Sequence, residues 1–254
     1  MTEPDRFTED AFLGGQLRLR QPKAGHRAGH DAMLLAAATA ARPGDRIADF
    51  GAGVGAAGLA VAKRVPETEI VLIEIDQALA ALARDNAASN AIVADIVAMD
   101  ITAGAAAFAA AGLPPDGFDV VLMNPPFNES PRHRSSPDKD RARAHVADAT
   151  TLDSWIRAAR RILKTGGVLT LIWRADALSE VLAALKPGFG SVTILPVHGN
   201  ASTPAIRVLV RAIKGGRAPM ALHPGLMLND ESGLPNKQLQ EILAGRATLP
   251  LARL

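Results

Sequence analysis

Residues 120–127, Val-Val-Leu-Met-Asn-Pro-Pro-Phe, join an apolar run to residue types that can do chemistry. Asn124 carries an amide, and Pro125 and Pro126 cannot donate to a sheet, so a core strand ends here. An amide oxygen, backbone carbonyls and the ring of Phe127 then come together at a strand end. One interpretation is a rigid turn that only stops the strand. The other is a site that accepts hydrogen bonds beside an aromatic face.

A glycine-rich loop, Asp49 to Gly55, precedes a predicted helix and reads Asp-Phe-Gly-Ala-Gly-Val-Gly. Gly51, Gly53 and Gly55 permit a tight turn and let a ligand approach the backbone. Their G-x-G-x-G spacing departs from the G-x-G-x-x-G of dinucleotide-binding loops, and Asp49 would repel a pyrophosphate. The loop therefore favours a ligand with a positive group and no phosphate.

Two acids end the next two predicted strands. Glu74 lies about 20 residues beyond the glycine loop, where an acid can accept both hydroxyls of a ribose. Asp100 ends the following strand and can accept from an adenine amino group. Any one of these acids could simply be a solvated strand end, but the ordered set with the glycine loop favours a nucleoside-binding site.

The elements that must position these residues alternate between strand and helix. Strands are predicted at 46–50, 69–75, 94–100, 118–123, 168–173, 191–197 and 207–213, and helices at 54–65, 77–89, 103–112, 152–167 and 176–186. This alternation predicts an α/β fold, a Rossmann-like, doubly wound, mostly parallel sheet of seven strands with helices on both faces.

We predict one domain over residues 1–254, because the sequence shows no repeat and no linker. A strand at 16–22 and a helix at 30–45, which Asp31 could cap, form an N-terminal extension at about 12–42. Residues from about 214 to 254 are predicted to be an irregular tail. The stretches 21–30 and 128–149 are also predicted to be irregular, and loops of that length are usually functional or mobile.

Composition excludes several classes of protein. The 254 residues are 48% hydrophobic and carry a net charge of +2, which is typical of a globular protein without a global nucleic-acid signature. The absence of cysteine excludes disulfides and thiolate metal sites. No apolar run reaches the roughly 20 residues of a membrane span, and the acidic N-terminus is unlike a signal peptide, so we expect a cytoplasmic protein.

The motifs DFGAGVG, IEID, MD and NPPF, in that order, resemble those of class I S-adenosylmethionine-dependent methyltransferases. The asparagine-proline-proline-aromatic motif of that family marks enzymes that methylate a nitrogen. With the lead-in LGGQLRLRQPKAGHRAGHDAMLLAAA and the downstream SPDKDRARAH, the chain more closely resembles the bacterial adenine N6-methyltransferases that act on valine tRNA, next to the anticodon.

The resemblance implies S-adenosylmethionine as cofactor. It implies that Gly51 and Gly53 line the methionine end and that Asp49 recognises the ammonium. It likewise assigns the ribose to Glu74 and the adenine to Asp100. Asp31, with His30 before it, would approach the methionine carboxylate, although this family often has a small or hydroxyl residue at position 30. A solvated surface histidine is therefore the favoured interpretation of His30.

For the target amine, we expect the Asn124 side-chain oxygen and the Pro125 carbonyl each to accept one N–H. Pro126 would stiffen this arrangement. Phe127 would stack on the target base after that base has flipped out of the nucleic acid. Positioning of the reactants and preorganised dipoles can catalyse the transfer of a methyl group to this amine, so neither a metal nor a covalent intermediate is required.

RNA binding requires positive charge near the site. Two basic stretches flank the predicted pocket in sequence and are expected to follow the phosphates: Arg18, Arg20, Lys23 and Arg27 in the lead-in, and Arg132, Arg134, Lys139, Arg141 and Arg143 after the motif.

Other functions stay open at this point. A protein glutamine N5-methyltransferase of the release-factor type shares the motif, but that family usually has tyrosine where Phe127 stands. A guanine N2 RNA methyltransferase is a second alternative. A catalytically silent RNA-binding relative is a third, and the intact acids argue against it.

Overall fold

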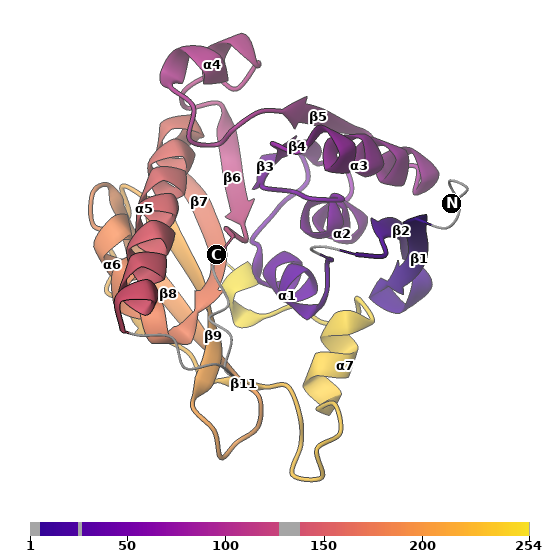
Figure 1. The fold of residues 1–254 in the computed structure, drawn as a ribbon, viewed down its shortest axis with the longest axis vertical. Coiled ribbons are helices and arrows are strands. Elements are labelled where there is room, and N and C mark those ends of the chain that lie inside the picture. Colours follow the sequence, from indigo (N-terminus) through magenta and orange to yellow (C-terminus); the bar gives the residue numbers. More distant parts are fainter. Residues whose placement is uncertain (1–5, 25–26, 127–137, 254) are drawn as a thin grey trace.

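The computed structural model describes residues 6–24, 27–126 and 138–253, and within 138–149 it describes the backbone alone. A twisted sheet forms its centre, with seven long strands in the order β8-β9-β7-β6-β3-β4-β5 (Figure 1). Among these strands β9 is antiparallel to its neighbours and the rest are parallel. The predicted α/β fold is confirmed. The strands are β3 Arg46–Phe50, β4 Glu69–Glu74, β5 Ala94–Ala98, β6 Phe118–Met123, β7 Leu163–Arg174, β8 Phe189–His198 and β9 Ala205–Lys214.

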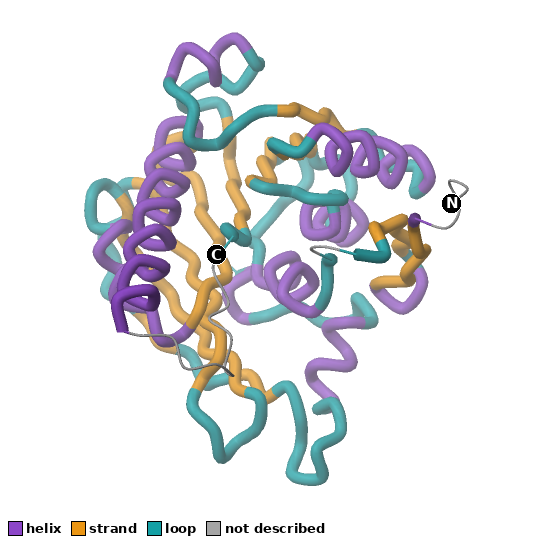
Figure 2. The backbone as a smooth tube through the Cα atoms, viewed as in Figure 1, coloured by secondary structure: helices purple, strands orange, loops and turns teal. Residues whose placement is uncertain are grey.

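Helices cover both faces of the sheet (Figure 2). One face packs against α1 His30–Ala38, α2 Ala56–Arg64 and α3 Gln77–Ser89, and the other against α4 Ala105–Ala110, α5 Asp138–Ile162 and α6 Leu178–Leu185. Each face has its own buried apolar cluster. Asp76 caps α3, because its side chain accepts from the backbone N–H groups of Ala78 and Leu79 at 2.8 and 3.1 Å.

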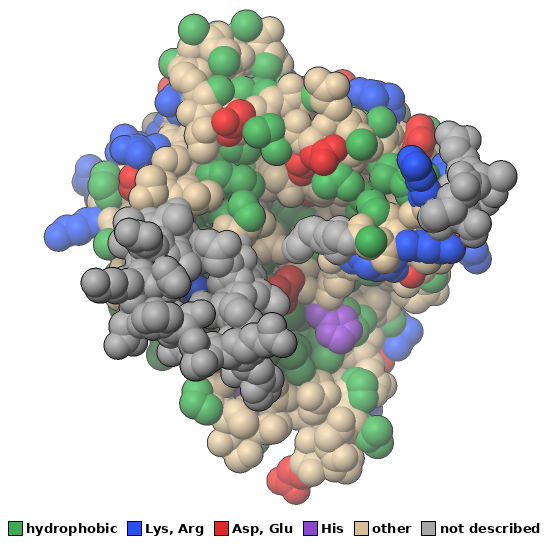
Figure 3. Space-filling model, in the orientation of Figure 1, with side chains coloured by type: hydrophobic (Ala, Val, Ile, Leu, Met, Phe, Trp, Pro, Cys, Tyr) green, Lys and Arg blue, Asp and Glu red, His purple; other side chains and the backbone are tan. Residues whose placement is uncertain are grey.

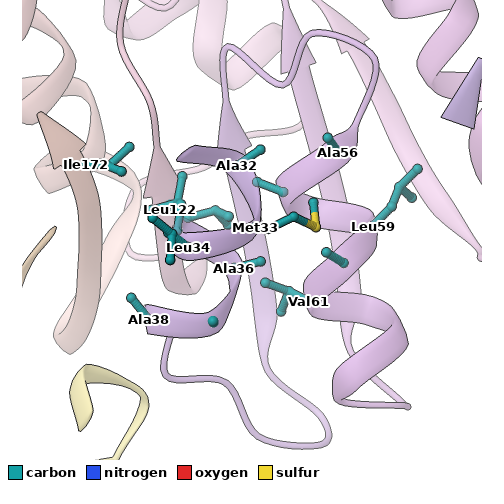
Figure 4. Close-up of a cluster of buried hydrophobic side chains, with 14 of the residues drawn as sticks. Ala32, Met33, Leu34, Ala36, Ala38, Ala56, Leu59, Val61, Leu122 and Ile172 are labelled. Carbon is teal, nitrogen blue, oxygen red and sulfur yellow. The ribbon is translucent and has the colours of Figure 1, made fainter. Parts of the chain in front are cut away.

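Helix α1 lies beside α2 in the first cluster and packs against β6, β7 and β9 of the sheet (Figure 4). Seven of its nine residues are buried. A helix that is apolar all round is buried all round, and its alanines let neighbours approach closely. Met33 and Leu34 pack among Leu59 of α2 and Leu122 of β6. This packing brings the N-terminus of α1 to the end of the sheet at which β3 and β6 finish.

The N-terminal extension is a hairpin of β1 Phe7–Phe12 and β2 Leu17–Pro22, joined by the 3₁₀ turn Leu13–Gly15. Strand β2 was predicted from alternation and β1 was not. The hairpin docks on α3 through two asparagine side chains, which form hydrogen bonds with the backbone N–H and C=O groups of β2. Asn90 Oδ1 accepts from Arg18 N at 2.9 Å, and Asn86 Oδ1 accepts from Arg20 N at 2.8 Å. Their amide groups donate back to the carbonyls of Arg18 and Arg20.

Three local predictions were wrong. Asp31 does not cap α1: the helix follows Gly29 without a side-chain cap and ends at Ala38, before Pro43 and Gly44. Helix α5 begins at Asp138, so the second half of the stretch predicted to be irregular is helical.

The tail is not irregular throughout. It adds two short strands to the edge at β8, β10 Ala221–Leu222 and β11 Leu226–Met227. It continues with α7 Lys237–Leu243 and the 3₁₀ turn Pro250–Ala252. Leu239, Ile242, Leu249 and Leu251 are buried in the cluster around α1. A seven-residue helix among glycines and prolines is short enough to escape a periodicity argument. The division into a single domain stays a prediction.

In the described part of the chain, no helix has the length and apolarity needed to cross a membrane.

Candidate functional site

A pocket of about 760 Å³ opens where β3, β4 and β6 end. Figure 3 shows the hollow, with acidic side chains and a histidine gathered around it. The chain leaves β3 for β4 on one side, and β6 later pairs with β3 on the other, so the pocket lies at a switch point of the sheet. Open α/β sheets bind ligands at such points, and this volume is within the usual range of roughly 300–1,000 Å³.

Strand alternation explains why the polar side chains meet. Ile47, Leu72 and Leu122 belong to the cluster beneath α1 and α2. Because side chains two residues apart share a face of a strand, Asp49, Glu74 and Asn124 are on that same face, two positions further along. All three line the pocket together with Asp31, Gly51, Gly53, Asp100, Pro125 and Pro126. The structure thus brings together the predicted cofactor-binding and catalytic residues that it describes.

The glycine loop has the conformation that its composition predicts. Gly51, Gly53 and Gly55 have φ of 66°, 57° and 88°, in the left-handed region that other residues rarely adopt. A Cβ at Gly51 would overlap the six-membered ring of Trp155 on α5. Gly53 donates its N–H to Glu74 Oε2 at 2.8 Å, which ties the loop to the end of β4.

Glu74 is 7% exposed and accepts two backbone hydrogen bonds, from Gly53 N on one oxygen and from Asp76 N on the other at 2.9 Å. A carboxylate oxygen has about two acceptor positions, so Glu74 can accept further hydrogen bonds. Asp100 is exposed at the rim of the pocket, where its Oδ1 accepts from Thr102 N at 2.8 Å. Both carboxylates therefore have acceptor capacity for hydroxyl or amino groups.

Asp49 is nearly completely buried, and its Oδ2 accepts from Gly58 N at 2.8 Å. Burial raises its pKa to about 7, the Gly58 hydrogen bond opposes this rise, and the nearby charge of Glu74 adds to it. A cation bound beside Asp49 would favour its ionised form.

The opening motif ends β6 as predicted, with Pro125 buried and Pro126 exposed. Asn124 Oδ1 is buried and has no hydrogen-bond partner among the described residues. Because a buried acceptor without a donor costs free energy, such an atom calls for an explanation. Phe127, predicted to stack on the target base, lies outside the described residues.

Charged residues surround the N-terminal end of α1. Asp31 Oδ2 accepts from Arg207 Nε at 3.0 Å, and both residues line the pocket. Arg27 also lines it, and its Nη2 contacts Asp10 at 2.6 Å. His30 is exposed, as expected of a surface histidine, yet it too lies on the pocket wall.

Sequence reasoning missed several residues of this wall, and two of them have aromatic or charged side chains. Trp155 is 8% exposed and packs edge-on against Phe50, with ring centroids 6.4 Å apart. It lies one turn after Leu152 on the buried stripe of α5, so helical spacing could have placed it. Arg207 is the third residue of β9 and one of three basic residues on that strand, so its charge alone did not mark it as a pocket residue.

The predicted RNA-binding residues are only partly described. Arg18 and Arg20 alternate with buried leucines on β2 and are exposed; Arg18 contacts Glu9 at 3.1 Å, and Arg20 lies over the Phe7 ring. Lys23 is exposed as well. The structure does not describe Arg132 and Arg134, nor the side chains of Lys139, Arg141 and Arg143.

A sequence model of the methyltransferase small domain family matches residues 28–200, which include the glycine loop, both acids and the Asn-Pro-Pro-Phe motif. The chain belongs to this family. It is an S-adenosylmethionine-dependent methyltransferase, and its fold is that of the class I enzymes.

Relatives of this methyltransferase differ in their stated activity. A tRNA1(Val) (adenine(37)-N6)-methyltransferase of Bacteroides thetaiotaomicron is 30% identical, over 68% of this chain and 70% of that protein. A ribosomal RNA small subunit methyltransferase C of Pseudomonas syringae is 28% identical, over 51% of this chain and 32% of that protein. The crystal structure of a predicted O-methyltransferase from Agrobacterium tumefaciens is 36% identical with a TM-score of 0.72, and covers 86% of this chain and 98% of that one.

The pocket residues fit this family's cofactor. S-adenosylmethionine combines a ribose and an adenine with an ammonium and a sulfonium, and it has no phosphate. Glu74 and Asp100 offer acceptors for the nucleoside, and Asp49 offers a carboxylate that a cation would favour in its ionised form. Within the described residues, no group of three or more His, Asp or Glu side chains could hold a metal ion.

Proposed function

We propose that this enzyme methylates the exocyclic N6 of an adenine in RNA, and that adenosine 37 of tRNA1(Val), next to the anticodon, is the first substrate to test. The observation that carries the proposal is Asn124 Oδ1, a buried acceptor with no donor among the described residues, on the wall of the pocket that also holds the predicted cofactor-binding residues. An adenine amine has two N–H groups to donate. The relative from B. thetaiotaomicron supports this choice of substrate.

In this mechanism the cofactor supplies an electrophilic methyl group on a sulfonium. The chain's own residues prepare the nucleophile, whose lone pair is otherwise delocalised into the purine ring. Asn124 Oδ1 and the Pro125 carbonyl each accept one N–H, which turns the nitrogen and directs its lone pair out of the ring plane. The prolines keep both acceptors in place, and preorganised dipoles of this kind lower barriers because they need no rearrangement during reaction.

Glu74 and Asp100 bind the cofactor's nucleoside in this proposal, and Asp49 with the backbone of Gly51 and Gly53 binds its methionine end. Asp31, held by Arg207, lies beside that end. Exposed Arg18 and Arg20 on the docked hairpin, with Lys23 and Arg27 after it, extend a positive surface to one side of the pocket for RNA phosphates. We also propose that the enzyme is cytoplasmic and that all 254 residues form one domain.

The test incubates the protein with methyl-labelled cofactor and bulk tRNA from a strain that lacks the modification. The RNA is digested, and the labelled nucleoside is identified by mass. Labelled N6-methyladenosine supports the proposal. Labelled N2-methylguanosine, a ribose O-methyl nucleoside or labelled protein refutes it and names the acceptor instead.

Ribosomal RNA is a second candidate substrate, because the relative from P. syringae is named for it. Naked small-subunit rRNA in the same assay, at equal nucleotide concentration, separates the two. Incorporation into rRNA that exceeds incorporation into tRNA would favour the second candidate.

A further inference from the structure

A short piece of the lead-in, Arg27 to Asp31, separates two cavities, and we call it the wall segment. All five of its residues line the pocket described above. Arg27, Ala28, Gly29 and His30 also line a second cavity of about 340 Å³, which lies beside the β1–β2 hairpin and α7. A stretch of chain with a cavity on each side loses dispersion contacts wherever partner atoms are missing. Packing alone therefore does not fix this part of the pocket wall.

Hydrogen bonds from the hairpin hold the wall segment instead. Gln21 of β2 accepts at Oε1 from Ala28 N at 2.8 Å, and its Nε2 donates to Asp10 Oδ2 of β1 at 2.9 Å. Arg27 donates to the same Asp10 oxygen at 2.6 Å and to the Pro22 carbonyl at 2.9 Å. Within the described part of the chain, Arg27 and Ala28 form no other hydrogen bond.

Gln21 is the residue on which this arrangement depends. It is 1% exposed, and glutamine is rarely buried to that extent. Its side-chain amide accepts at one end and donates at the other, so it can join a backbone N–H to a carboxylate. Because both ends are paired, displacement of either neighbour would leave a buried polar group without a partner. Asp10 then connects both Gln21 and Arg27 to the hairpin.

The wall segment lies away from the two acids that we assign to the cofactor's nucleoside. It leads into α1, which packs against β6, β7 and β9. Asp31, its last residue, contacts Arg207 of β9. Glu74 ends β4 and Asp100 follows β5, and both of these strands are on the other side of β3 in the sheet. A displaced wall segment should therefore affect the methionine end of the ligand and not its nucleoside.

We propose that Gln21 is a positioning residue for the methionine end of the cofactor site. It acts through Ala28, which lines the pocket, and through Asp10, which also holds Arg27. These hydrogen bonds put the wall segment in place before the cofactor binds. Without them the binding form is only partly populated, and the apparent dissociation constant rises by the inverse of that fraction. This inference uses the family's cofactor and does not depend on the proposed RNA substrate.

The test compares the binding of two ligands by calorimetry. S-adenosylhomocysteine, the demethylated product, carries the amino-acid group, whereas 5′-methylthioadenosine has the nucleoside and the sulfur without it. Gln21→Met removes both polar ends of the amide and keeps a side chain of similar length. It should weaken S-adenosylhomocysteine binding roughly tenfold and leave 5′-methylthioadenosine within about twofold of the parent value. The Ala28 amide should also exchange its hydrogen faster, because its acceptor is gone.

Asp10→Ala is the second variant, because the Asp10 side chain is 34% exposed and the position tolerates substitution if Gln21→Met does not fold. It removes the acceptor that Gln21 and Arg27 share, so it should show the same selectivity between the ligands with a smaller effect, roughly threefold.

Thr8→Val is the matched control. The Thr8 hydroxyl donates to the same Asp10 oxygen at 3.0 Å but forms no hydrogen bond with the wall segment, so both ligands should bind this variant as they bind the parent. Urea unfolding verifies that each variant is folded.

Several results overturn the proposal. If the folded variants bind both ligands equally weakly, the hydrogen bonds support the whole pocket and not one end of it. If neither ligand binds more weakly, whatever the exchange rate of Ala28, the wall segment takes no part in cofactor binding. If Thr8→Val matches Gln21→Met, the stability of the hairpin decides instead. A parent protein that binds no S-adenosylhomocysteine also refutes the proposal, whereas one that binds it but methylates no RNA refutes only the proposed function.

Discussion

At the residue scale, the proposed chemistry depends on two acceptors, the Asn124 side-chain oxygen and the Pro125 carbonyl, and a substitution can remove the first of them. Asn124→Ala removes a buried acceptor that has no donor among the described residues, so we expect the free energy of unfolding to change by less than about 1 kcal/mol. Single-turnover methylation should slow by roughly 100- to 1000-fold, because a hydrogen bond made in the transition state is worth about 2.7–4 kcal/mol. Cofactor affinity, measured by calorimetry, should stay near that of the parent.

Asn124→Asp is the matched comparison, because it keeps an acceptor oxygen at the same position. It should retain more of the rate than Asn124→Ala. If Asn124→Ala reacts within about threefold of the parent, a difference of roughly 0.7 kcal/mol, the motif is a strand-ending turn and the mechanism is wrong.

We predict that Asp49 makes cofactor binding depend on pH. Its pKa of about 7 in the folded protein is above the ordinary value of 3.8, so the stability contributed by its neutral form is present below pH 3.8 and lost as pH rises through 7. A bound ammonium favours the ionised form and lowers this pKa. Cofactor affinity should therefore rise roughly tenfold between pH 6 and pH 8, and binding at pH 6 should release protons.

Calorimetry in two buffers of different ionisation enthalpy measures that proton release. Asp49→Asn keeps an acceptor for Gly58 N but cannot titrate, so its cofactor affinity should vary less with pH. A parent protein whose affinity is flat between pH 6 and pH 8 would show that Asp49 does not sense the ligand's charge.

At the element scale, the β1–β2 hairpin depends on the asparagine contacts with α3. Asn86 is completely buried and makes three hydrogen bonds, to the N–H and C=O of Arg20 and to the carbonyl of Val54. Asn86→Ala leaves these backbone groups without partners, and we expect it to destabilise the fold by about 2–4 kcal/mol. The amide proton of Arg20 should then exchange much faster in hydrogen-exchange measurements.

Asn90→Ala is the control for that prediction. Asn90 makes the equivalent contacts with Arg18, but in a more exposed position where water can replace the lost partner. Its effect on unfolding should be smaller. Equal effects of the two substitutions would mean that burial of the asparagine contacts does not decide how firmly the hairpin docks.

At the scale of the whole molecule, the C-terminal tail is part of the core. Leu249 and Leu251 are completely buried in the α1 cluster, and Arg211 of β9 donates to the carbonyl of Leu251 at 2.9 Å. Leu251→Ala should cost about 2–5 kcal/mol, because it leaves a cavity in that cluster. Urea unfolding should remain a single transition at lower denaturant concentration if all 254 residues form one domain. A separate early transition would show that the tail unfolds by itself.

The sequence by itself determined the fold class and most of the predicted site. Alternating strand and helix patterns predicted the seven long strands, because periodicity of burial is a local property of the chain. The site motifs could be identified from the sequence, because tight turns, charges at strand ends and strand termination by proline depend on the local residues. These motifs are the glycines at 51, 53 and 55, the acids at 49, 74 and 100, and Asn-Pro-Pro-Phe. Gly51, Gly53, the three acids, Asn124, Pro125 and Pro126 line one pocket because β3, β4, β5 and β6 are parallel and end on the same side of the sheet.

Only the tertiary structure decided the rest, because those features depend on which distant segments pack together. Trp155 meets Gly51 from the opposite face of the sheet, and Asp31 meets Arg207 across 176 residues of sequence. The docking of β2 by Asn86 and Asn90 and the burial of the tail against α1 likewise have no local signal. The register that sets Arg174 opposite Arg207 is fixed by the pairing of β7 with β9, and no local pattern encodes that pairing.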